Sequence, residues 1–480
     1  MAQKQQQKDK NGLLLLIRNG HPMTLRQQLY LTAQLSMPAI MAQLSSTLMQ
    51  YIDASMVGSL GAGASASIGL VSTSTWLFWG MCTAAATGFS VQVAHLIGAG
   101  NHEGAKSVLR QAITSTFLFS TLLALVGMGI SGSLPHWLGG DASIREDASR
   151  YFCIFTASLP ALQMNFLGGS MLRCSGNMAV PSLLNVLMCI LDVIFNTLLI
   201  FPSHDLQLWE GFTVHLPGAG LGVTGAALGT ALAEVVTASL MMWFLCFRST
   251  DLRIARKRGS FLPQASCLKK ALHIGLPMGC EHAVLCGAQI LTTVIVAPLG
   301  TFAIAANSFA ITAESLCYMP GYGVADAATT LVGQSLGAGR KRLARKFASI
   351  TVLTGIGVMT FMGIVMYVAA PLMMNIMTPV EEVRQLGIMA LRIEAFAEPM
   401  FAASIVAYGV FVGAGDTLVP SLMNLFSIWA VRLTLAAVLA PGMGLKGVWL
   451  AMCIELCFRG IIFLIRLRGK KWMKTTVVNN

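Results

Sequence analysis

Two aspartates lie inside long apolar stretches of the sequence, where an ionisable side chain is costly and therefore a candidate for function. Asp53 follows Pro38 by 15 residues, and Asp192 follows Pro181 by 11, with Asn196 one helical turn further on the same face. At 1.5 Å per helical residue, the two acids reach roughly 22 Å and 16 Å into their stretches, which predicts a similar depth. A carboxylate there can bind and release H+ or Na+ as its solvation changes, and so couple an ion flux to a second flux.

The second half of the chain places other ionisable residues in its apolar stretches. Five of them are candidates for lining a cleft in that half: Glu281, Glu314, Asp326, Glu398 and Arg432. Arg432 lies 12 residues past Pro420, which places it roughly 18 Å deep. A guanidinium at that depth requires a carboxylate, and Glu398, Glu394 and Glu455 are the candidates. We expect a structural pairing of Arg432 rather than a direct role in transport.

The elements that position these residues are membrane-spanning helices. The chain has 480 residues, of which 55% are hydrophobic and only 11% charged, whereas soluble chains carry roughly 25% charged residues. Apolar stretches longer than about 18 residues recur along it, which is typical of a polytopic membrane protein. We place twelve spans at about 30–58, 64–94, 112–134, 151–172, 180–201, 220–246, 271–297, 303–333, 347–371, 385–411, 418–440 and 447–466.

The positive charges lie on one side of this arrangement. Of the 32 Lys and Arg, 26 fall in alternate loops and in the two ends, with the C-terminal end counted from Arg459; four fall in the other loops, and two, Arg392 and Arg432, fall within spans. This asymmetry predicts that both termini and the 247–270 linker are cytoplasmic, in the plasma (inner) membrane of a bacterium. It divides the chain into a tail (1–29), a lobe (30–246), the linker, a second lobe (271–466) and a tail (467–480). It also explains the net charge of +12 without a nucleic-acid partner.

The two lobes are repeats of one another. The segment GNMAVPSLLN (176–185) matches GDTLVPSLMN (415–424) at six of ten positions, and the same offset of 239 residues holds over about 150 residues. Further along, the offset falls to 222, which indicates a 17-residue insertion in the polar stretch 203–219, on the outer side. Six spans return the chain to its starting side, so the repeats are parallel. We therefore expect an all-α fold of two six-helix bundles that enclose a cleft and rock to give alternating access.

Several motifs in this order resemble the multidrug and toxic compound extrusion (MATE) family. They are YIDASMVGSLG in the first span, LRCSGNMAVPSLLN and LDVIFN around the fifth, and VGQSLGAGRKR and VGAGDTLVP in the second half. The resemblance covers about residues 30–465. It implies a secondary antiporter that exports organic cations and other amphipathic compounds, driven by inward H+ or Na+, with no cofactor beyond the coupling ion.

The resemblance also implies an ion site in the first lobe. The family places an Asp in span one, an Asn in span four, an Asp in span five and a Thr in span six, which Asp53, Asn165, Asp192 and Thr230 match. Family members often carry an Asn one turn before the span-five Asp, where this chain has Met188. This departure favours H+ over Na+, although a Na+ at Asp53 and Asp192 remains an open alternative.

The ion site of the second lobe, which some family members possess, is missing its acids in this chain. The expected Glu of span seven is Leu285 and the expected Asp of span ten falls at about Phe401. Glu281, one turn before Leu285, is a candidate substitute; the alternative is a carboxylate near the membrane edge. We therefore expect ion coupling mainly in the first lobe, with the second lobe shaping the cleft for substrate.

Three other functions remain alternatives. A flippase or exporter of a lipid-linked or other endogenous metabolite would need a strongly basic cleft, and with the C-terminal end counted from Arg459, only Arg432 and Arg392 are intramembrane cations. A membrane enzyme would need clustered His or metal ligands, but the eight His lie mostly in loops or at span ends. A passive channel would ignore ion gradients. We expect a transporter, not an enzyme, that meets only its small-molecule substrate and the lipid bilayer and works as a monomer.

Overall fold

The chain folds almost entirely into helices. The computed structural model describes residues 10–209, 212–254 and 259–474. The first repeat contains α3 (Leu25–Gly58), α4 (Ala62–Gly98), α5 (His102–Ile130), the short α6 (Leu134–Trp137), α7 (Ala142–Ala157) continued by α8 (Leu159–Cys174), α9 (Ala179–Ile200) and α10 (Val223–Trp243), which ends in the π-helical η1 (Phe244–Arg248).

The second repeat follows the same plan. It contains α11 (Ala265–Val296) with η2 (Ala297–Leu299), α12 (Thr301–Gly337), α13 (Lys341–Met377), α14 (Glu381–Glu394) continued by α15 (Glu398–Gly413), then α16 (Leu418–Phe426), η3 (Ser427–Leu433) and α17 (Thr434–Met443) as one span, and α18 (Leu445–Arg468) followed by η4 (Lys471–Lys474). The predicted all-α architecture of twelve spans in two six-helix lobes is confirmed.

Most of these spans are apolar enough to be recognised singly. Among the described residues, eight helices are long and apolar enough to cross a membrane, and the bent pair α14–α15, with an angle of 61°, makes a ninth. Polar residues are frequent in α3 and α12, which contain many Ser, Thr, Gln and Gly residues. These two helices pack against each other between the lobes, so their polar side chains can face protein rather than lipid.

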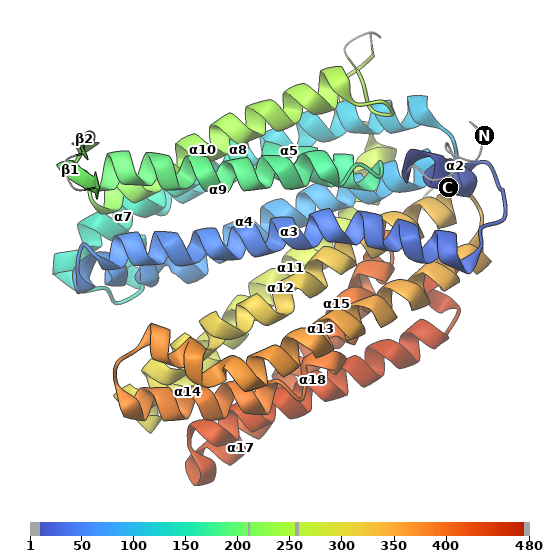
Figure 1. The fold of residues 1–480 in the computed structure, drawn as a ribbon. Helices are drawn as coiled ribbons and strands as arrows, with labels where there is room; N and C mark the ends of the chain where they lie inside the picture. Colours follow the sequence, from blue (N-terminus) through green and yellow to red (C-terminus); the bar gives the residue numbers. More distant parts are fainter. Residues whose placement is uncertain (1–9, 210–211, 255–258, 475–480) are drawn as a thin grey trace.

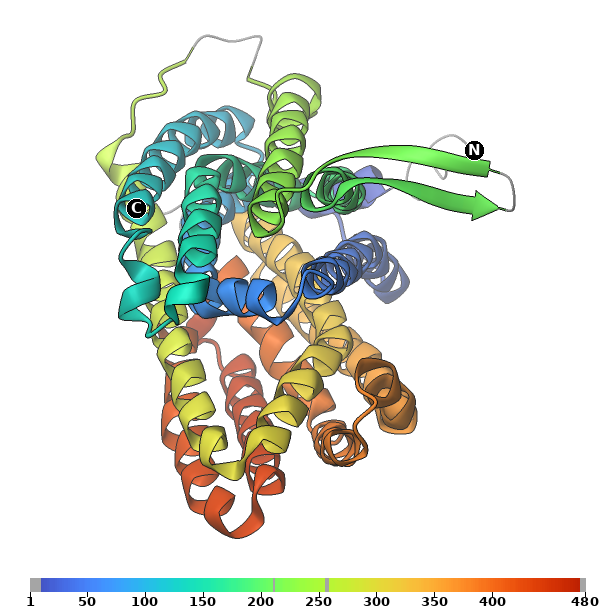
Figure 2. The same ribbon diagram turned by 90° about the vertical axis from the view of Figure 1, so that its left-hand side faces the viewer.

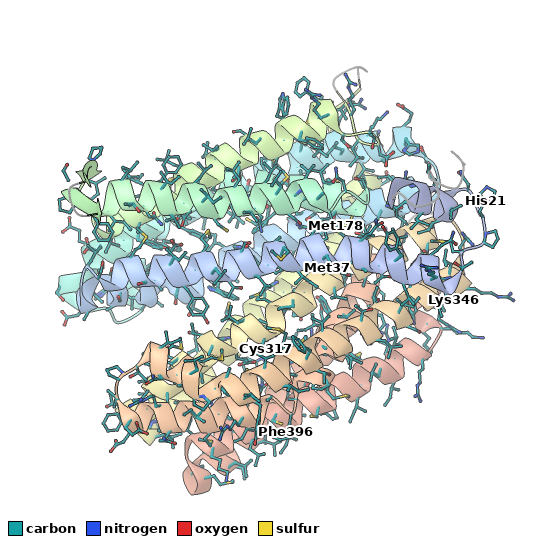
Figure 3. All side chains as sticks on the ribbon, in the orientation of Figure 1. His21, Met37, Met178, Cys317, Lys346 and Phe396 are labelled. Atoms are coloured by element: carbon teal, nitrogen blue, oxygen red, sulfur yellow. The ribbon has the colours of Figure 1, made fainter. Side chains whose placement is uncertain are left out.

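The 17-residue insertion between spans five and six forms a β-hairpin. Strands β1 (Pro202–Trp209) and β2 (Phe212–Ala219) pair antiparallel. Figures 1 and 2 show the hairpin projecting from one end of the first lobe, and in Figure 1 the described part of the chain begins and ends at the opposite end. We call these the hairpin end and the termini end; His21 and Lys346 mark the latter in Figure 3.

The lobes meet at the termini end and diverge toward the hairpin end (Figure 1). Gly98 of α4 and Gly337 of α12 are equivalent in the two repeats, being 239 residues apart. A Cβ atom at Gly98 would collide with the carbonyl oxygen of Gln334, and one at Gly337 with that of His95. His95 Nε2 also lies 2.8 Å from the carbonyl oxygen of Gly413. Two glycines therefore let α4 and α12 cross with their backbones in contact.

A helix near the N-terminus, α2 (Lys10–Arg18), packs next to this crossing of α4 and α12. Leu13, Leu14 and Ile17 are 1%, 2% and 0% exposed, and they join a core with residues of α12 and α13. The apolar segment of the predicted N-terminal tail is thus an integral part of the folded protein.

Polar contacts attach α2 to both lobes. Arg18 donates to the carbonyl oxygen of Ser175 in the first lobe at 3.1 Å and pairs with Asp251 of the linker at 3.1 Å. From the second lobe, Arg340 donates to the carbonyl oxygen of Leu16 at 3.0 Å. These bonds fasten the two lobes together at the termini end, so α2 has to detach on one side before the lobes can separate there.

Leu14→Ala is expected to loosen α2, because Leu14 fills the space beside Gly176 of the first lobe and is almost fully buried. Trypsin should then cleave after Arg18 faster than in the parent protein. Leu15→Ala is the matched control, since Leu15 is 47% exposed on the same helix. Equal cleavage rates in the two variants would contradict this packing.

Candidate ion-coupling site

The acid pair of the first lobe joins α3 to α9. Asn196 Nδ2 donates to Asp53 Oδ1 at 3.0 Å and to Asp192 Oδ2 at 3.1 Å. Asp53 lies five residues before the end of α3 and Asp192 eight before the end of α9, which puts both in the half of the lobe nearer the hairpin. The structure thus brings together the two acids that the sequence placed at a similar depth and Asn196, one helical turn beyond Asp192.

Two oxygen atoms at this site can accept further hydrogen bonds. Asp192 is fully buried and Asn196 is 1% exposed. Within the described part of the chain, Asp192 Oδ1 and Asn196 Oδ1 have no hydrogen-bond partner. Gly229 of α10 closes the site, because a Cβ atom there would collide with Asn196 Oδ1. Buried oxygens without a donor are costly, and a proton or a small cation between them would remove that cost.

Asn165 takes a different partner from the one expected. Its Nδ2 donates to Glu234 Oε1 of α10 at 2.7 Å, and both side chains are buried. Met188 Sδ lies 3.8 Å from the same nitrogen. Thr230 is half-buried on α10, and neither aspartate is hydrogen-bonded to it in the described residues. Asn165 and Glu234 therefore form a second polar pair, which lies within electrostatic range of Asp192.

Helix α3 connects the acid pair to the opposite lobe. Tyr51, two residues before Asp53, donates its hydroxyl to the carbonyl oxygen of Thr312 on α12. Nearer the termini end, Gly323 of α12 packs against the backbone of Ile40, two residues after Pro38, which lies inside the continuous helix α3. A displacement of α3 against α9 would therefore move contacts with the second lobe.

Glu281 is the centre of a hydrogen-bonded group in the second lobe. It is 5% exposed and accepts from Tyr408 Oη and from Asn424 Nδ2, both at 2.7 Å. Asn424 is the repeat equivalent of Asn185, which donates to Ser46 of α3 at 3.0 Å. Asn424 could therefore have been predicted from the repeated sequence motif. No feature of the sequence pointed to Tyr408.

Arg432 pairs with Glu455, one of its three candidate partners. The closest nitrogen–oxygen distance is 2.7 Å, and Glu455 is fully buried. Arg459, which sequence reasoning did not single out, contacts the same carboxylate at 2.9 Å. Asp326 lies elsewhere, between the lobes, where its carboxylate is 3.8 Å from Arg173 Nε of the first lobe.

The architecture of two repeated six-helix lobes and its buried acids define a membrane transporter of the MATE type. The MatE family model matches residues 38–198 and 277–438, two segments that begin 239 residues apart as the repeat requires. The chain therefore belongs to this family.

Particular relatives cover almost the whole chain. A probable multidrug resistance protein NorM from Thermotoga maritima is 24% identical over 93% of this chain and 93% of its own, and one from Idiomarina loihiensis is 25% identical over 91% and 93%. A solved structure described as the outward-facing conformation of a multidrug resistance MATE family transporter has a TM-score of 0.84 and 21% identity, over 95% of this chain and 97% of its own. A transporter from Pyrococcus furiosus gives the same values.

Proposed function

We propose that this protein is a proton-coupled antiporter that exports amphipathic, cationic or aromatic small molecules across the bacterial plasma membrane. The observation that carries the proposal is the Asp53–Asn196–Asp192 group, which is buried, contains unused acceptor oxygens and sits on the helix that contacts the other lobe. The relatives named as multidrug resistance proteins support the class of substrate. The excess of Lys and Arg at the termini end supports a cytoplasmic location of that end.

The proposed cycle follows from this geometry. With the lobes in contact at the cytoplasmic end, the acid pair takes up a proton from outside. Protonation removes a negative charge and turns a carboxylate that only accepts hydrogen bonds into a group that also donates. The bridge through Asn196 then rearranges and α3 shifts against α9, which moves its contacts with α12 and releases substrate outward. After the lobes reorient, the proton leaves to the cytoplasm and a new substrate binds.

Dye transport in proteoliposomes tests this function. Proteoliposomes that contain the protein as a monomer should accumulate a cationic dye when an imposed pH gradient drives protons in the opposite direction. A Na+ gradient at equal pH should have little effect on this accumulation. The physical reason is that Met188 replaces an amide that could complete a Na+ shell. Transport driven by Na+ alone would identify the other ion. Transport that follows the dye gradient and ignores both ions would overturn antiport.

A further inference from the structure

The second lobe contains a separate group of buried charges, midway along its length near Cys317 in Figure 3. It comprises four carboxylates and two guanidiniums, which we call the second-lobe acid cluster: Glu314 of α12, Glu394 of α14, Glu398 of α15, Arg432 of η3, and Glu455 and Arg459 of α18. With all acids ionised, the cluster would carry two uncompensated negative charges in a buried site.

The two arginines can compensate only two of the four acids. Glu455 accepts from both Arg432 and Arg459, and also from Ser427. Glu314 lies within electrostatic range of the same two arginines. Glu394 also lies within electrostatic range of Arg432, whereas no arginine of the described chain is in range of Glu398. Two positive charges can balance only two of the four acids, so two protons are needed to neutralise the cluster.

Glu394 and Glu398 form no hydrogen bond of regular geometry in the described chain. Both are 0% exposed, and none of their four carboxylate oxygens has such a partner among residues 10–209, 212–254 and 259–474; the Cys317 thiol, a weak donor, is the neighbour that approaches Glu398. Around them lie the acids already named, Cys317 of α12 with Tyr318 beside it, and Cys453 of α18. Gly363 of α13 packs against the Glu398 side chain. A buried carboxylate without a strong donor or an ion pair of its own is highly unfavourable unless it is neutral.

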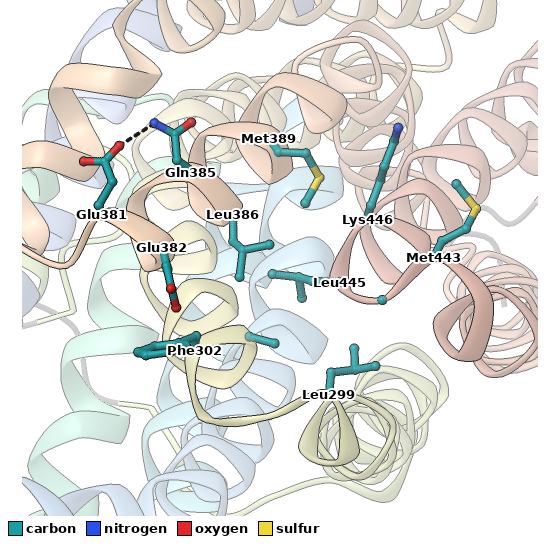
Figure 4. A pocket seen from close by; sticks show the side chains of 12 residues that line it. Leu299, Phe302, Glu381, Glu382, Gln385, Leu386, Met389, Met443, Leu445 and Lys446 are labelled. Atoms are coloured by element: carbon teal, nitrogen blue, oxygen red, sulfur yellow. Dashed lines mark hydrogen bonds between the residues drawn. The ribbon is translucent and has the colours of Figure 1, made fainter.

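A pocket lies on the hairpin side of this cluster, at the ends of three of the helices that carry its acids. It has a volume of about 600 Å³ and is lined by the ends of α12, α14 and α18, with Glu381, Glu382 and Lys446 among its side chains (Figure 4). Leu386 of the pocket and Glu394 are eight residues apart on α14, roughly 12 Å along the helix.

A side-chain hydrogen bond between α18 and α12 lies along these helices between the pocket and the cluster. Trp449 Nε1 donates to Asn307 Oδ1 at 3.0 Å, and small buried residues surround them: Ala306, Ala310, Ala390 and Ala451. This layer separates the cluster from the pocket, and the side-chain amide of Asn307 lies on the route between them.

We propose that Glu394 and Glu398 are a second proton-binding site, that each holds one proton in the conformation described here, and that the protons enter through the pocket at the hairpin end. A proton suits the site better than a metal ion, because two guanidiniums are adjacent and no group of three His, Cys, Asp or Glu in the described chain has metal-binding geometry. Occupancy by protons stands on its own; their use in export rests on the proposed function.

Infrared spectroscopy of the purified full-length protein at neutral pH tests this inference. Protonated carboxyl groups have a carbonyl band that ionised ones lack and that shifts in D2O. Glu394→Gln and Glu398→Gln should each remove the intensity of one protonated carboxyl, and the double variant that of two. Glu146→Gln is the control, because Glu146 is an exposed acid on α7 and should leave this band unchanged.

Each possible outcome of these experiments either supports or overturns the inference. Loss of ionised-carboxylate bands instead of the protonated band would overturn the inference. Failure of both single variants to fold would also count against it, since Gln matches a neutral Glu in shape and charge. Asn307→Leu should slow the D2O shift of the band, and an unchanged rate would overturn the entry route. The infrared measurement uses resting protein and does not depend on transport. Absence of the protonated band would overturn this inference even if dye transport is proton-driven, and its presence would support the inference even if dye transport is not proton-driven.

Discussion

Asp53→Asn is expected to reduce dye export driven by a pH gradient to the level of protein-free liposomes. Asparagine has the shape of the aspartate and can still accept a hydrogen bond from Asn196, but it cannot take up a proton. The hydrogen-bonded bridge between α3 and α9 would then keep one arrangement, so α3 would not shift and its contacts with α12 would stay unchanged. Asp192→Asn should have the same effect, because both carboxylates share the Asn196 donor.

The controls separate coupling from folding. Glu146→Gln changes an exposed acid of the same lobe and should transport as the parent protein does. Binding of the fluorescent dye to purified Asp53→Asn should persist, since the contacts between the lobes at the termini end do not involve Asp53. If Asp53→Asn exports the dye at the normal rate against its gradient, the acid pair is not the coupling site.

Much of the fold was predictable because membrane insertion imposes strong sequence constraints. A span must be long and apolar, positive loops face one side, and a fixed offset of 239 residues relates Gly98 to Gly337 and Asn185 to Asn424. The insertion between spans five and six was found from the offset, but its hairpin was not. Burial of α2 was also beyond reach, because Leu13 to Ile17 alone do not reveal what they pack against.

The site was predictable in depth but not in pairing. Counting residues from Pro38 and Pro181 placed Asp53 and Asp192 at one level because the helical rise is constant. Which side chains then meet depends on the rotation of each helix about its axis, and for this reason Asn165 was expected near Asp53, whereas the structure pairs it with Glu234.

The partner of Arg432 illustrates a further limit. Three glutamates were candidates, and the choice depends on the phase of the helix that carries the arginine. Arg432 lies in η3, a π-helical segment between α16 and α17, where the wider turn rotates the following side chains relative to an α-helix. Counting in steps of 3.6 residues fails across such a segment, so the sequence could not select Glu455.

Glu455→Gln is expected to destabilise the protein by about 3–5 kcal/mol, the usual cost of breaking a buried ion pair by removing one partner. Glu455 is fully buried and is the hydrogen-bonded carboxylate for both Arg432 and Arg459, so its loss leaves two guanidiniums without their main acceptor. The midpoint of thermal unfolding in detergent, followed by the loss of monodisperse protein, should fall clearly.

Two matched substitutions show whether this cost reflects charge pairing. Glu381→Gln breaks an ion pair with Arg384 in which the glutamate is 64% exposed, and water and salt screen such pairs, so the midpoint should hardly move. Glu394→Gln removes an acid as deeply buried as Glu455 but without a partner, and should also be well tolerated. If Glu394→Gln and Glu455→Gln lower the midpoint equally, the arginines do not distinguish the two acids, and the charge balance of the second-lobe acid cluster is different from the one derived from its contacts.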